Sequence, residues 1–315
     1  METPTSDEKI MAALAHASVL LSFLGPIGPT LIWAFQRTKS KYVRYHALQA
    51  MGYQSLLFWI WIIGIFVVVF GAVFLMVVLE VIFMDSTSSE MPFAPFIMQP
   101  IIVLGMFGLW GVFFIIGVIG AVFCIMGRDF NYPVIGTWLK KKVFSDQITE
   151  AESEEWESGW VGGVCHATAI LQLWGIFTPL LVWVLQKDRS EKLRFQALQA
   201  TIYQLISFIV YMAAMMAYMA IIFMAIAGIS ILGMTDPTLA NGGDAPQGMG
   251  IFMIVFIGVI MIFWTLLMIA TPIYYIMAAI ASVFTIRGKN FKYPILGALL
   301  TKQMNKAKKN IALTS

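Results

Sequence analysis

Charged residues are scarce in this sequence of 315 residues, of which 12% are Asp, Glu, Lys or Arg and 60% are hydrophobic. A soluble domain contains about a quarter charged residues, so a chain this apolar has too little polar surface to stay folded in water. The mean hydropathy is +0.83, and several apolar runs exceed the roughly 18 residues that cross a hydrocarbon core. The composition therefore predicts an integral membrane protein.

Signals for catalysis, metal binding and nucleic-acid binding are also missing. The net charge is only +3, whereas a nucleic-acid-binding face needs clustered Lys and Arg, so no nucleic-acid partner is expected. Cys124 and Cys165 lie in or beside apolar runs and outside any ligand spacing, so they are interpreted as packing residues. The sequence has no phosphate loop, nucleophile elbow, HExxH motif or paired carboxylates. We expect no enzyme, no cofactor and no bound metal.

The chain carries one unit twice. An offset of 150 residues matches special positions in the two halves, among them His16 with His166, Gly25 with Gly175, Pro29 with Pro179 and Gln49 with Gln199. Near the end of each half the offset becomes 161 and matches GRDFNYP at 127–133 with GKNFKYP at 288–294. Apolar composition alone does not produce such matches, so we predict a tandem duplication. The predicted repeats are 1–144 and 161–315, joined by a solvated acidic linker at 145–160.

Each repeat contains three apolar segments, at about 10–35, 47–84 and 100–126 in the first repeat and 161–185, 197–234 and 251–286 in the second. If every segment crosses the membrane, the repeats are inverted and the 20 Lys and Arg residues divide 12 against 8 between the two sides. If the first segment of each repeat enters and leaves on one side, all 20 lie on that side. Cytoplasmic loops are rich in Lys and Arg, so we favour the second arrangement.

Helix-breaking residues in the first segments support this choice. They are Gly25, Pro26, Gly28 and Pro29 in the first repeat, and Gly175 and Pro179 in the second. Proline lacks the amide donor that a helix interior needs, so a break is expected in each repeat, milder in the second. The predicted fold class is an all-α integral membrane protein. Each copy has a broken or re-entrant first segment, a two-helix transmembrane hairpin and a C-terminal amphipathic surface helix, at about 133–144 and 294–309.

This topology places both termini and the linker on the cytoplasmic side of the bacterial inner membrane. An inverted three-plus-three arrangement remains open, because many transporters are built in that way.

Polar residues at the start of the second segments are the main candidates for a site. They are Arg44, Gln49, Tyr53 and Gln54, with their counterparts Arg194, Gln199, Tyr203 and Gln204. Residues four apart share one helix face, and polar groups hydrogen-bond across helices inside membranes. We predict that they attach the first segment to the hairpin; a polar groove for a peptide or partner helix is the alternative. His16 and His166 are interpreted as interfacial histidines that make one hydrogen bond, rather than as a proton relay or ligands.

The run KYVRYHALQA at 41–50, followed by GRDFNYP at 127–133, resembles a known family. It is similar to the bacterial relatives of the polytopic membrane subunit of the chloroplast inner-envelope translocon, the Tic complex, which include a bacterial domain of unknown function. The resemblance covers almost all of both repeats. It implies a helical, non-enzymatic protein; the plastid member acts in protein import, and some bacterial relatives lie in magnetosome membranes. Gln196 replaces His46 in the second repeat, which argues against a histidine-dependent function shared by both.

The predicted function is a non-enzymatic, multi-pass scaffold, assembly or translocation-associated subunit of a membrane complex. The alternative is a small-solute transporter, for which inverted repeats and a polar site at the membrane midplane would be expected. The expected partners are the lipid bilayer, anionic lipids at the C-terminal lysines, and proteins of the same complex.

Overall fold

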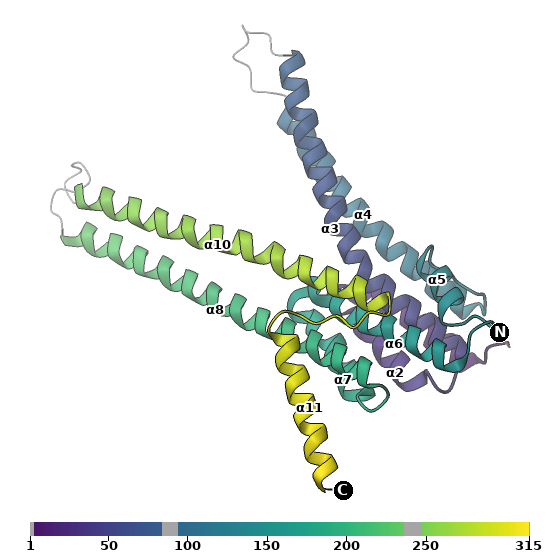
Figure 1. The fold of residues 1–315 in the computed structure, drawn as a ribbon. Coiled ribbons are helices and arrows are strands. Elements are labelled where there is room, and N and C mark those ends of the chain that lie inside the picture. Colours follow the sequence, from purple (N-terminus) through teal and green to yellow (C-terminus); the bar gives the residue numbers. More distant parts are fainter. Residues whose placement is uncertain (1–2, 84–93, 236–246, 315) are drawn as a thin grey trace.

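The computed structural model describes residues 3–83, 94–235 and 247–314 (Figure 1). Its elements follow the same order twice. The first repeat contains α1 (Ser6–Ala17), η1 (Ser18–Leu24), α2 (Ile27–Gln36), α3 (Lys41–Phe83), α4 (Ala94–Ile125) and α5 (Ile135–Lys142). The second contains α6 (Glu150–Ala167), η2 (Thr168–Ile176), α7 (Phe177–Gln186), α8 (Glu191–Thr235), α10 (Gln247–Ile286) and α11 (Leu296–Thr314). The prediction of an all-α tandem duplication is confirmed.

Five stretches of the described chain are long and apolar enough to cross a membrane. They are Lys41–Val78, Gln99–Ile125, Glu150–Gln186, Glu191–Ile231 and Gly250–Ile286. Four of them belong to the hairpin helices α3, α4, α8 and α10, whose large apolar side chains are extensively exposed. Exposed apolar surface on this scale is stable in lipid rather than in water. The chain is therefore a multi-pass membrane protein.

The first segment of each repeat is broken, as predicted. In the first repeat the backbone turns at Ser22, with φ 56° and ψ −117°; in the second it turns at Gln172, with φ 52° and ψ −125°. Beyond the turn, α2 returns to pack against α1, and α7 returns to pack against α6. The fifth apolar stretch, Glu150–Gln186, therefore contains a turn and does not run as one straight helix.

The position and strength of the break differ from the prediction. The turns come before the expected Gly and Pro residues, because Pro26 is the N-cap of α2 and Pro29 lies in its first turn, where a missing N–H is tolerated. Gly25 instead allows the backbone to pass close to the turn. A Cβ at this position would lie only 2.9 Å from the Ser22 carbonyl oxygen. The expectation of a milder break in the second repeat is wrong, because both repeats make the same turn.

The other residues predicted to break the helix have similar roles. At Gly28 a Cβ would lie 2.6 Å from the Cβ of Ser18, and at Gly175 it would lie 2.0 Å from the carbonyl oxygen of Thr168. Pro179 lies in the first turn of α7 and is buried. These residues therefore allow α2 and α7 to return closely along the segment that precedes the turn.

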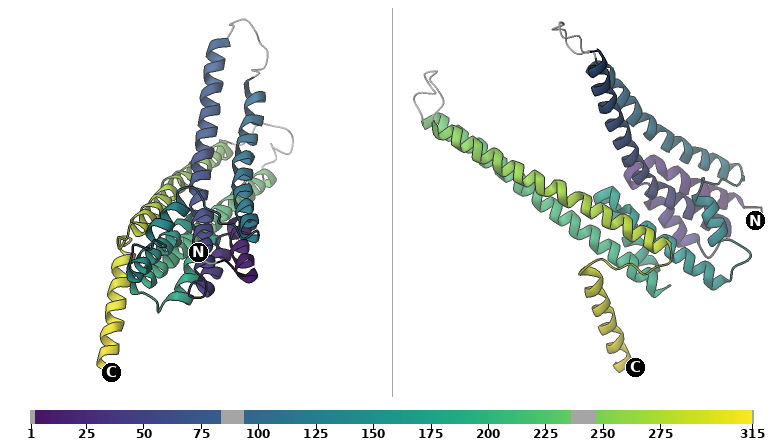
Figure 2. Two further views of the ribbon diagram at one scale, coloured as in Figure 1. Left: turned by 90° about the vertical axis from the view of Figure 1, so that its right-hand side faces the viewer. Right: turned by 45° about the horizontal axis from the view of Figure 1, so that its top comes forward.

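The two hairpins extend from one base. In both figures α3 with α4, and α8 with α10, leave the cluster of broken segments and diverge toward their tips (Figures 1 and 2). The two tips lie on the side away from this cluster, whereas α11 extends away from both hairpins (Figure 1). Inverted repeats would send the hairpins in opposite directions, so the repeats are arranged in parallel.

The stretch 145–160 differs from the solvated linker that its acidic composition predicted. Thr149 caps α6 in a capping box with Glu152, so the helix already begins at Glu150. Glu157 and Trp160 are then buried, with 0% and 3% of their surfaces exposed. The acidic stretch is therefore mostly the first turns of α6, and part of it lies inside the protein.

A continuous apolar core joins the repeats at the base. Trp33, Leu48 and Met51 from the first repeat pack in the same cluster as Val164 and Leu193 from the second. Because the cluster draws on both repeats, the base is one packed unit from which the hairpins emerge.

Candidate functional site

Gln49 and Gln199 hold the chain that follows each hairpin. Gln49 is fully buried; its Nε2 donates to the carbonyl oxygen of Phe130 at 3.2 Å, and its Oε1 accepts from the backbone N–H of Tyr132 at 3.0 Å. Gln199 repeats both bonds in the second copy, at 3.1 Å each. Each glutamine therefore satisfies a backbone acceptor and a backbone donor that would otherwise be buried without a partner.

Tyr53 and Tyr203 connect the two helices of each hairpin. The Tyr53 hydroxyl donates to the carbonyl oxygen of Phe113 in α4 at 3.0 Å, and its ring stacks on Tyr132 with centroids 3.9 Å apart. Tyr203 donates to the carbonyl oxygen of Tyr274 at 3.1 Å and stacks on Tyr293 at 3.8 Å. The two repeats therefore match in these side-chain contacts as well as in sequence.

Gln54 and Gln204 attach the broken segment. Gln54 Nε2 donates to the carbonyl oxygen of Ala15 at 3.0 Å, and Ser18 Oγ donates to Gln54 Oε1 at 3.2 Å. Gln204 donates to the carbonyl oxygen of Cys165 at 2.8 Å. The last carbonyls of a helix lack intrahelical partners, so these bonds stabilise the ends of α1 and α6 where the chain turns. Among the repeated glutamines and tyrosines, Gln54 and Gln204 therefore make the predicted contact with the first segment, whereas the others contact the hairpin and the chain that follows it.

Arg44 has a different role from its counterpart. It pairs with the fully buried Glu157 of the other repeat, whereas Arg194 is exposed on α8. Glu157 also accepts from Trp33 Nε1 at 2.6 Å, Arg189 Nη1 at 3.3 Å and Arg37 Nε at 3.4 Å. Glu154 pairs with Arg37 at 2.8 Å and with Arg189. We call these two glutamates and three arginines the inter-repeat ion cluster.

Tryptophan and glutamine side chains add direct bonds between the repeats. Trp160 Nε1 donates to the carbonyl oxygen of Leu48 at 3.1 Å, and Trp59 Nε1 donates to that of Ala167 at 2.8 Å. Gln186 Nε2 donates to the carbonyl oxygen of Ala34 at 3.1 Å. Together with the ion cluster, these bonds fix the broken segment of the second repeat against α2 and α3 of the first.

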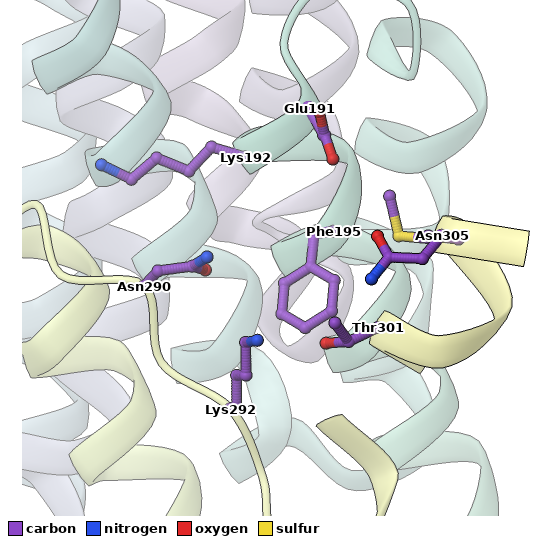
Figure 3. Close-up of a pocket in the computed structure, with 8 residues that line it drawn as sticks. Glu191, Lys192, Phe195, Asn290, Lys292, Thr301 and Asn305 are labelled. Atoms are coloured by element: carbon purple, nitrogen blue, oxygen red, sulfur yellow. The ribbon is translucent and has the colours of Figure 1, made fainter. Parts of the chain in front are cut away.

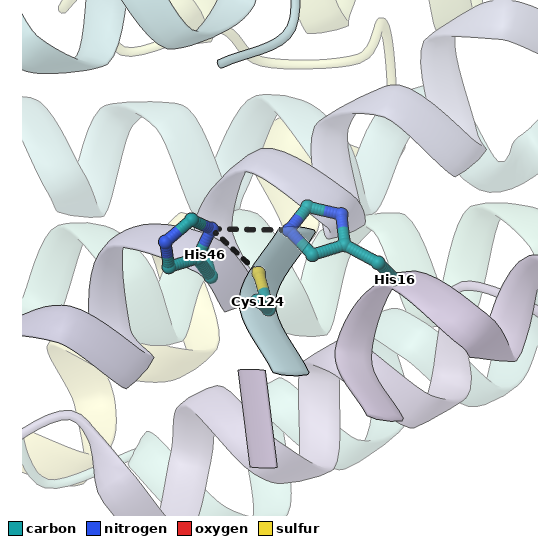
Figure 4. Close-up of side chains that lie close together, drawn as sticks. All are labelled: His16, His46 and Cys124. Atoms are coloured by element: carbon teal, nitrogen blue, oxygen red, sulfur yellow. Dashed lines mark hydrogen bonds between the residues drawn. The ribbon is translucent and has the colours of Figure 1, made fainter. Parts of the chain in front are cut away.

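The histidines are buried, and each makes a polar contact through both ring nitrogens instead of the single hydrogen bond that was expected. His16 is 0% exposed; its Nδ1 lies 2.9 Å from the Tyr132 hydroxyl and its Nε2 lies 3.1 Å from His46 Nδ1. Cys124 Sγ lies 3.4 Å from the same His46 nitrogen (Figure 4). Burial raises the pKa of Tyr132 well above its ordinary value, so its hydroxyl stays neutral. We call His16, His46 and Cys124 the His–His–Cys cluster.

The second repeat replaces this cluster. His166 Nδ1 lies 3.1 Å from the Tyr293 hydroxyl, and its Nε2 lies 2.8 Å from Gln196 Oε1. Thr285 stands at the position that matches Cys124. The sequence reasoning missed the cluster because its three residues come from α1, α3 and α4, with 30 and 78 residues between successive members.

A surface pocket of about 340 Å³ lies between the start of α8, the connection before α11, and α11 (Figure 3). Its polar lining includes Lys192, Asn290, Lys292 and Asn305. Lys192 is already engaged by the Gly288 carbonyl oxygen at 2.7 Å and Glu155 at 3.2 Å. The lining thus combines one acid, Glu191, and one hydroxyl, Thr301, with two amides and two lysines.

These features define the class: a helical membrane protein in which two copies of one unit, a broken segment followed by a hairpin, are joined at a common base. The model of the MamF/MmsF family of magnetosome magnetite crystal formation proteins matches residues 7–139 and 157–300, so the chain belongs to that family. No curated protein and no solved structure matches it.

This finding corrects the assignment to the Tic-like family. The motif behind the resemblance contains Gln49 and Arg44, which bond to backbone groups and to Glu157 inside the protein. The motif is therefore explained by the packing of these helices and does not indicate a role in protein import. The implied role in translocation is withdrawn together with the resemblance.

Proposed function

We propose that this protein is a non-enzymatic scaffold of the magnetosome membrane, a membrane derived from the bacterial inner membrane, and that it acts in magnetite crystal formation. The family description supports the process and the location. The observation that carries the scaffold role is the use of the repeated polar residues. Gln49, Gln199, Gln54 and Gln204 bond to backbone groups of their own repeat, which leaves them unavailable to a substrate.

The surface of the protein supports the same role. The base is fixed by the inter-repeat ion cluster, and the hairpins α3–α4 and α8–α10 present long apolar faces. Such faces bind lipid chains or the helices of other membrane proteins. A rigid base with two diverging hairpins is suited to holding lipid and protein partners at fixed positions.

A transporter is the less supported alternative. Transporters with inverted repeats place a polar binding site near the membrane midplane, between the repeats. Here the hairpins run parallel, and the repeated glutamines and tyrosines lie where the hairpins join the base. Polar groups at the base and apolar faces along the hairpins favour the scaffold.

The arrangement can be tested by its sidedness. We propose that both termini and all Lys and Arg residues lie on the cytoplasmic side, where the C-terminal lysines contact anionic lipid headgroups. Single cysteines would replace Ser88 or Asn241, which lie outside the described residues, in a chain with Cys124→Ser and Cys165→Ser. An impermeant thiol reagent is expected to label both from the non-cytoplasmic side. Labelling of only one would support inverted repeats.

The function can be tested in the bacterium that carries the gene. Deletion is expected to change the number or size of magnetite crystals in electron micrographs, and the wild-type gene is expected to restore them. Variants at Gln49, Gln199 and Glu157 would then be compared for folded protein in the magnetosome membrane and for crystals formed. A scaffold predicts that the two quantities fall together. A variant with normal protein but no crystals would indicate an enzyme or transporter, and unchanged crystals after deletion would exclude the proposed role.

A further inference from the structure

We propose that the His–His–Cys cluster of the first repeat binds a structural zinc ion through His16 Nε2, His46 Nδ1 and Cys124 Sγ. The three donor atoms all lie within 4.8 Å of one another. The His16 and His46 nitrogens are 3.1 Å apart, and Cys124 Sγ is 3.4 Å from the His46 nitrogen. Tetrahedral zinc with Zn–N near 2.0 Å and Zn–S near 2.3 Å requires separations of roughly 3.3 and 3.6 Å. The two contacts of His46 are thus close to that geometry, and the third pair, His16 Nε2 and Cys124 Sγ, lies within 4.8 Å and would close to roughly 3.6 Å on binding.

The surroundings of the cluster also fit a metal site. All three side chains are 0% exposed, and they converge from α1, α3 and α4 (Figure 4). A histidine that binds zinc through one ring nitrogen usually forms a hydrogen bond with the other, which fixes the ring. His16 meets this requirement, because its Nδ1 lies 2.9 Å from the Tyr132 hydroxyl, whereas His46 Nε2 has no hydrogen-bond partner among the described residues. An ion here would join the N-terminal helix to both helices of the hairpin.

Tyr42 is the candidate for a fourth ligand. Its ring centroid lies 4.5 Å from that of His46, and the residue is 5% exposed. Its buried hydroxyl contacts the side chain of Cys124. This contact places the Tyr42 oxygen beside a ligand of the proposed ion.

The second repeat provides an internal control. His166 is retained there, but Gln196 and Thr285 stand at the positions of His46 and Cys124, and Lys192 stands at that of Tyr42. There the Gln196 side-chain oxygen lies 2.8 Å from His166 Nε2 and takes the place of the His46 nitrogen. The same fold therefore forms around a hydrogen bond in the second repeat, and the donor set for a metal belongs to the first repeat alone.

The donor chemistry favours zinc over ferrous iron. Two imidazoles and one thiolate suit zinc, and the usual order of stability places Fe²⁺ below Zn²⁺ at nitrogen and sulfur sites. On binding, the Cys124 thiol releases its proton to solvent and the thiolate forms the metal–sulfur bond, so no oxidant or reductant is needed. This inference rests on the geometry of the cluster and is independent of the proposed function.

The test uses the full chain purified in detergent, stripped of metal by a chelator and titrated with Co²⁺, which takes the same geometry as zinc and is visible by absorption. We expect one equivalent of Co²⁺ with a thiolate-to-cobalt charge-transfer band, displaced by equimolar Zn²⁺ but not by equimolar Fe²⁺. Cys124→Ser should abolish the band. Cys165→Ser is the matched control, because Cys165 is the other buried free cysteine, and it should retain the band. A band that persists in Cys124→Ser, or no band in the unmodified chain, would overturn the proposal.

Further variants separate metal binding from folding. His46→Gln installs the residue that the second repeat already accommodates, so we expect a normal helical circular dichroism spectrum without the cobalt band. Tyr132→Phe should weaken binding by about 10–100-fold through loss of the bond to His16. Gln196→His combined with Thr285→Cys builds the same set of two histidines and one cysteine in the second repeat, without a counterpart of Tyr42, and should add a second equivalent of Co²⁺ at lower affinity. Normal binding in His46→Gln, or no second ion in the double variant, would contradict the assignment.

Discussion

The two repeats share one framework but differ at their centres and at their contact with each other. In both, a glutamine holds the chain after the hairpin and a tyrosine connects the hairpin helices, with distances that agree within 0.1 Å. The buried centres differ, with His16 facing His46 and Cys124 in one repeat and His166 facing Gln196 in the other. Residues that define the framework are thus kept in both copies, whereas the residues that it encloses have diverged.

The contact between the repeats is also unequal. The first helix of the second repeat, α6, has 18 residues, whereas α1 has 12. The added residues, 150–155, include Glu154, which pairs with Arg37 of the first repeat; Glu157 lies in the part of α6 that α1 also has and pairs with Arg44. Asp7 matches Glu157 in the duplication but is exposed, as is Arg194, which matches Arg44. The interface therefore depends on acids from one repeat only, and this asymmetry can be tested.

The largest effect is expected from Glu157→Gln, which removes the only fully buried charge of the ion cluster. Arg44 would lose its partner and Arg189 one of its two partners, at positions where their side chains are 20% and 7% exposed. Breaking a buried ion pair from one side typically destabilises a protein by about 3–5 kcal/mol. We therefore expect a large fall in the thermal unfolding temperature in detergent.

Two controls sharpen this comparison. Glu155 lies two residues away and pairs with Lys192 while 68% exposed, so Glu155→Gln should cost less than about 1 kcal/mol. Asp7→Asn changes the matching position of the first repeat and should also have little effect. If Glu157→Gln were no more destabilising than these two variants, the ion cluster would not hold the repeats together.

A smaller effect, equal in both repeats, is expected from Gln49→Leu and Gln199→Leu. Each substitution removes two hydrogen bonds to the backbone, and each intramembrane bond contributes roughly 0.6–2 kcal/mol. The double variant should show about the sum of the single effects. Gln303→Leu on α11 is the control, because Gln303 is exposed. The measurement is again thermal unfolding in detergent, and unchanged stability accompanied by loss of a bound partner would favour the groove interpretation.

The sequence was sufficient for features that depend on composition and spacing. The membrane class and the duplication followed from apolar runs and a fixed offset. The polar residues at the start of the second segments were found by their spacing, but only Gln54 and Gln204 contact the first segment, whereas Gln49 and Gln199 hold the chain after the hairpin. The stretch 145–160 was wrongly predicted to be a solvated linker because the prediction relied on its acidic composition. The capping box of Thr149 and Glu152, a local signal for the start of a helix, was not used. The His–His–Cys cluster could not be predicted, because its members meet only after three helices have packed. The family was misassigned because packing motifs recur among unrelated functions.

The smallest effect concerns the turn that breaks each first segment. Ser22 and Gln172 have φ of 56° and 52°, in a region that glycine adopts at little cost and other residues rarely enter. Such strain costs of order 1–3 kcal/mol, whereas glycine adds roughly 0.5–1 kcal/mol of entropy to the unfolded chain. Ser22→Gly should therefore stabilise the protein by about 1 kcal/mol. Gln172→Gly should gain less, because it also loses the 3.2 Å bond from Gln172 Nε2 to the Tyr275 hydroxyl. Ser22→Val, which is β-branched, should destabilise. The unfolding temperatures of the three variants would measure this order. Destabilisation by Ser22→Gly would show that residue 22 is helical in the membrane and that the first segment is not broken there.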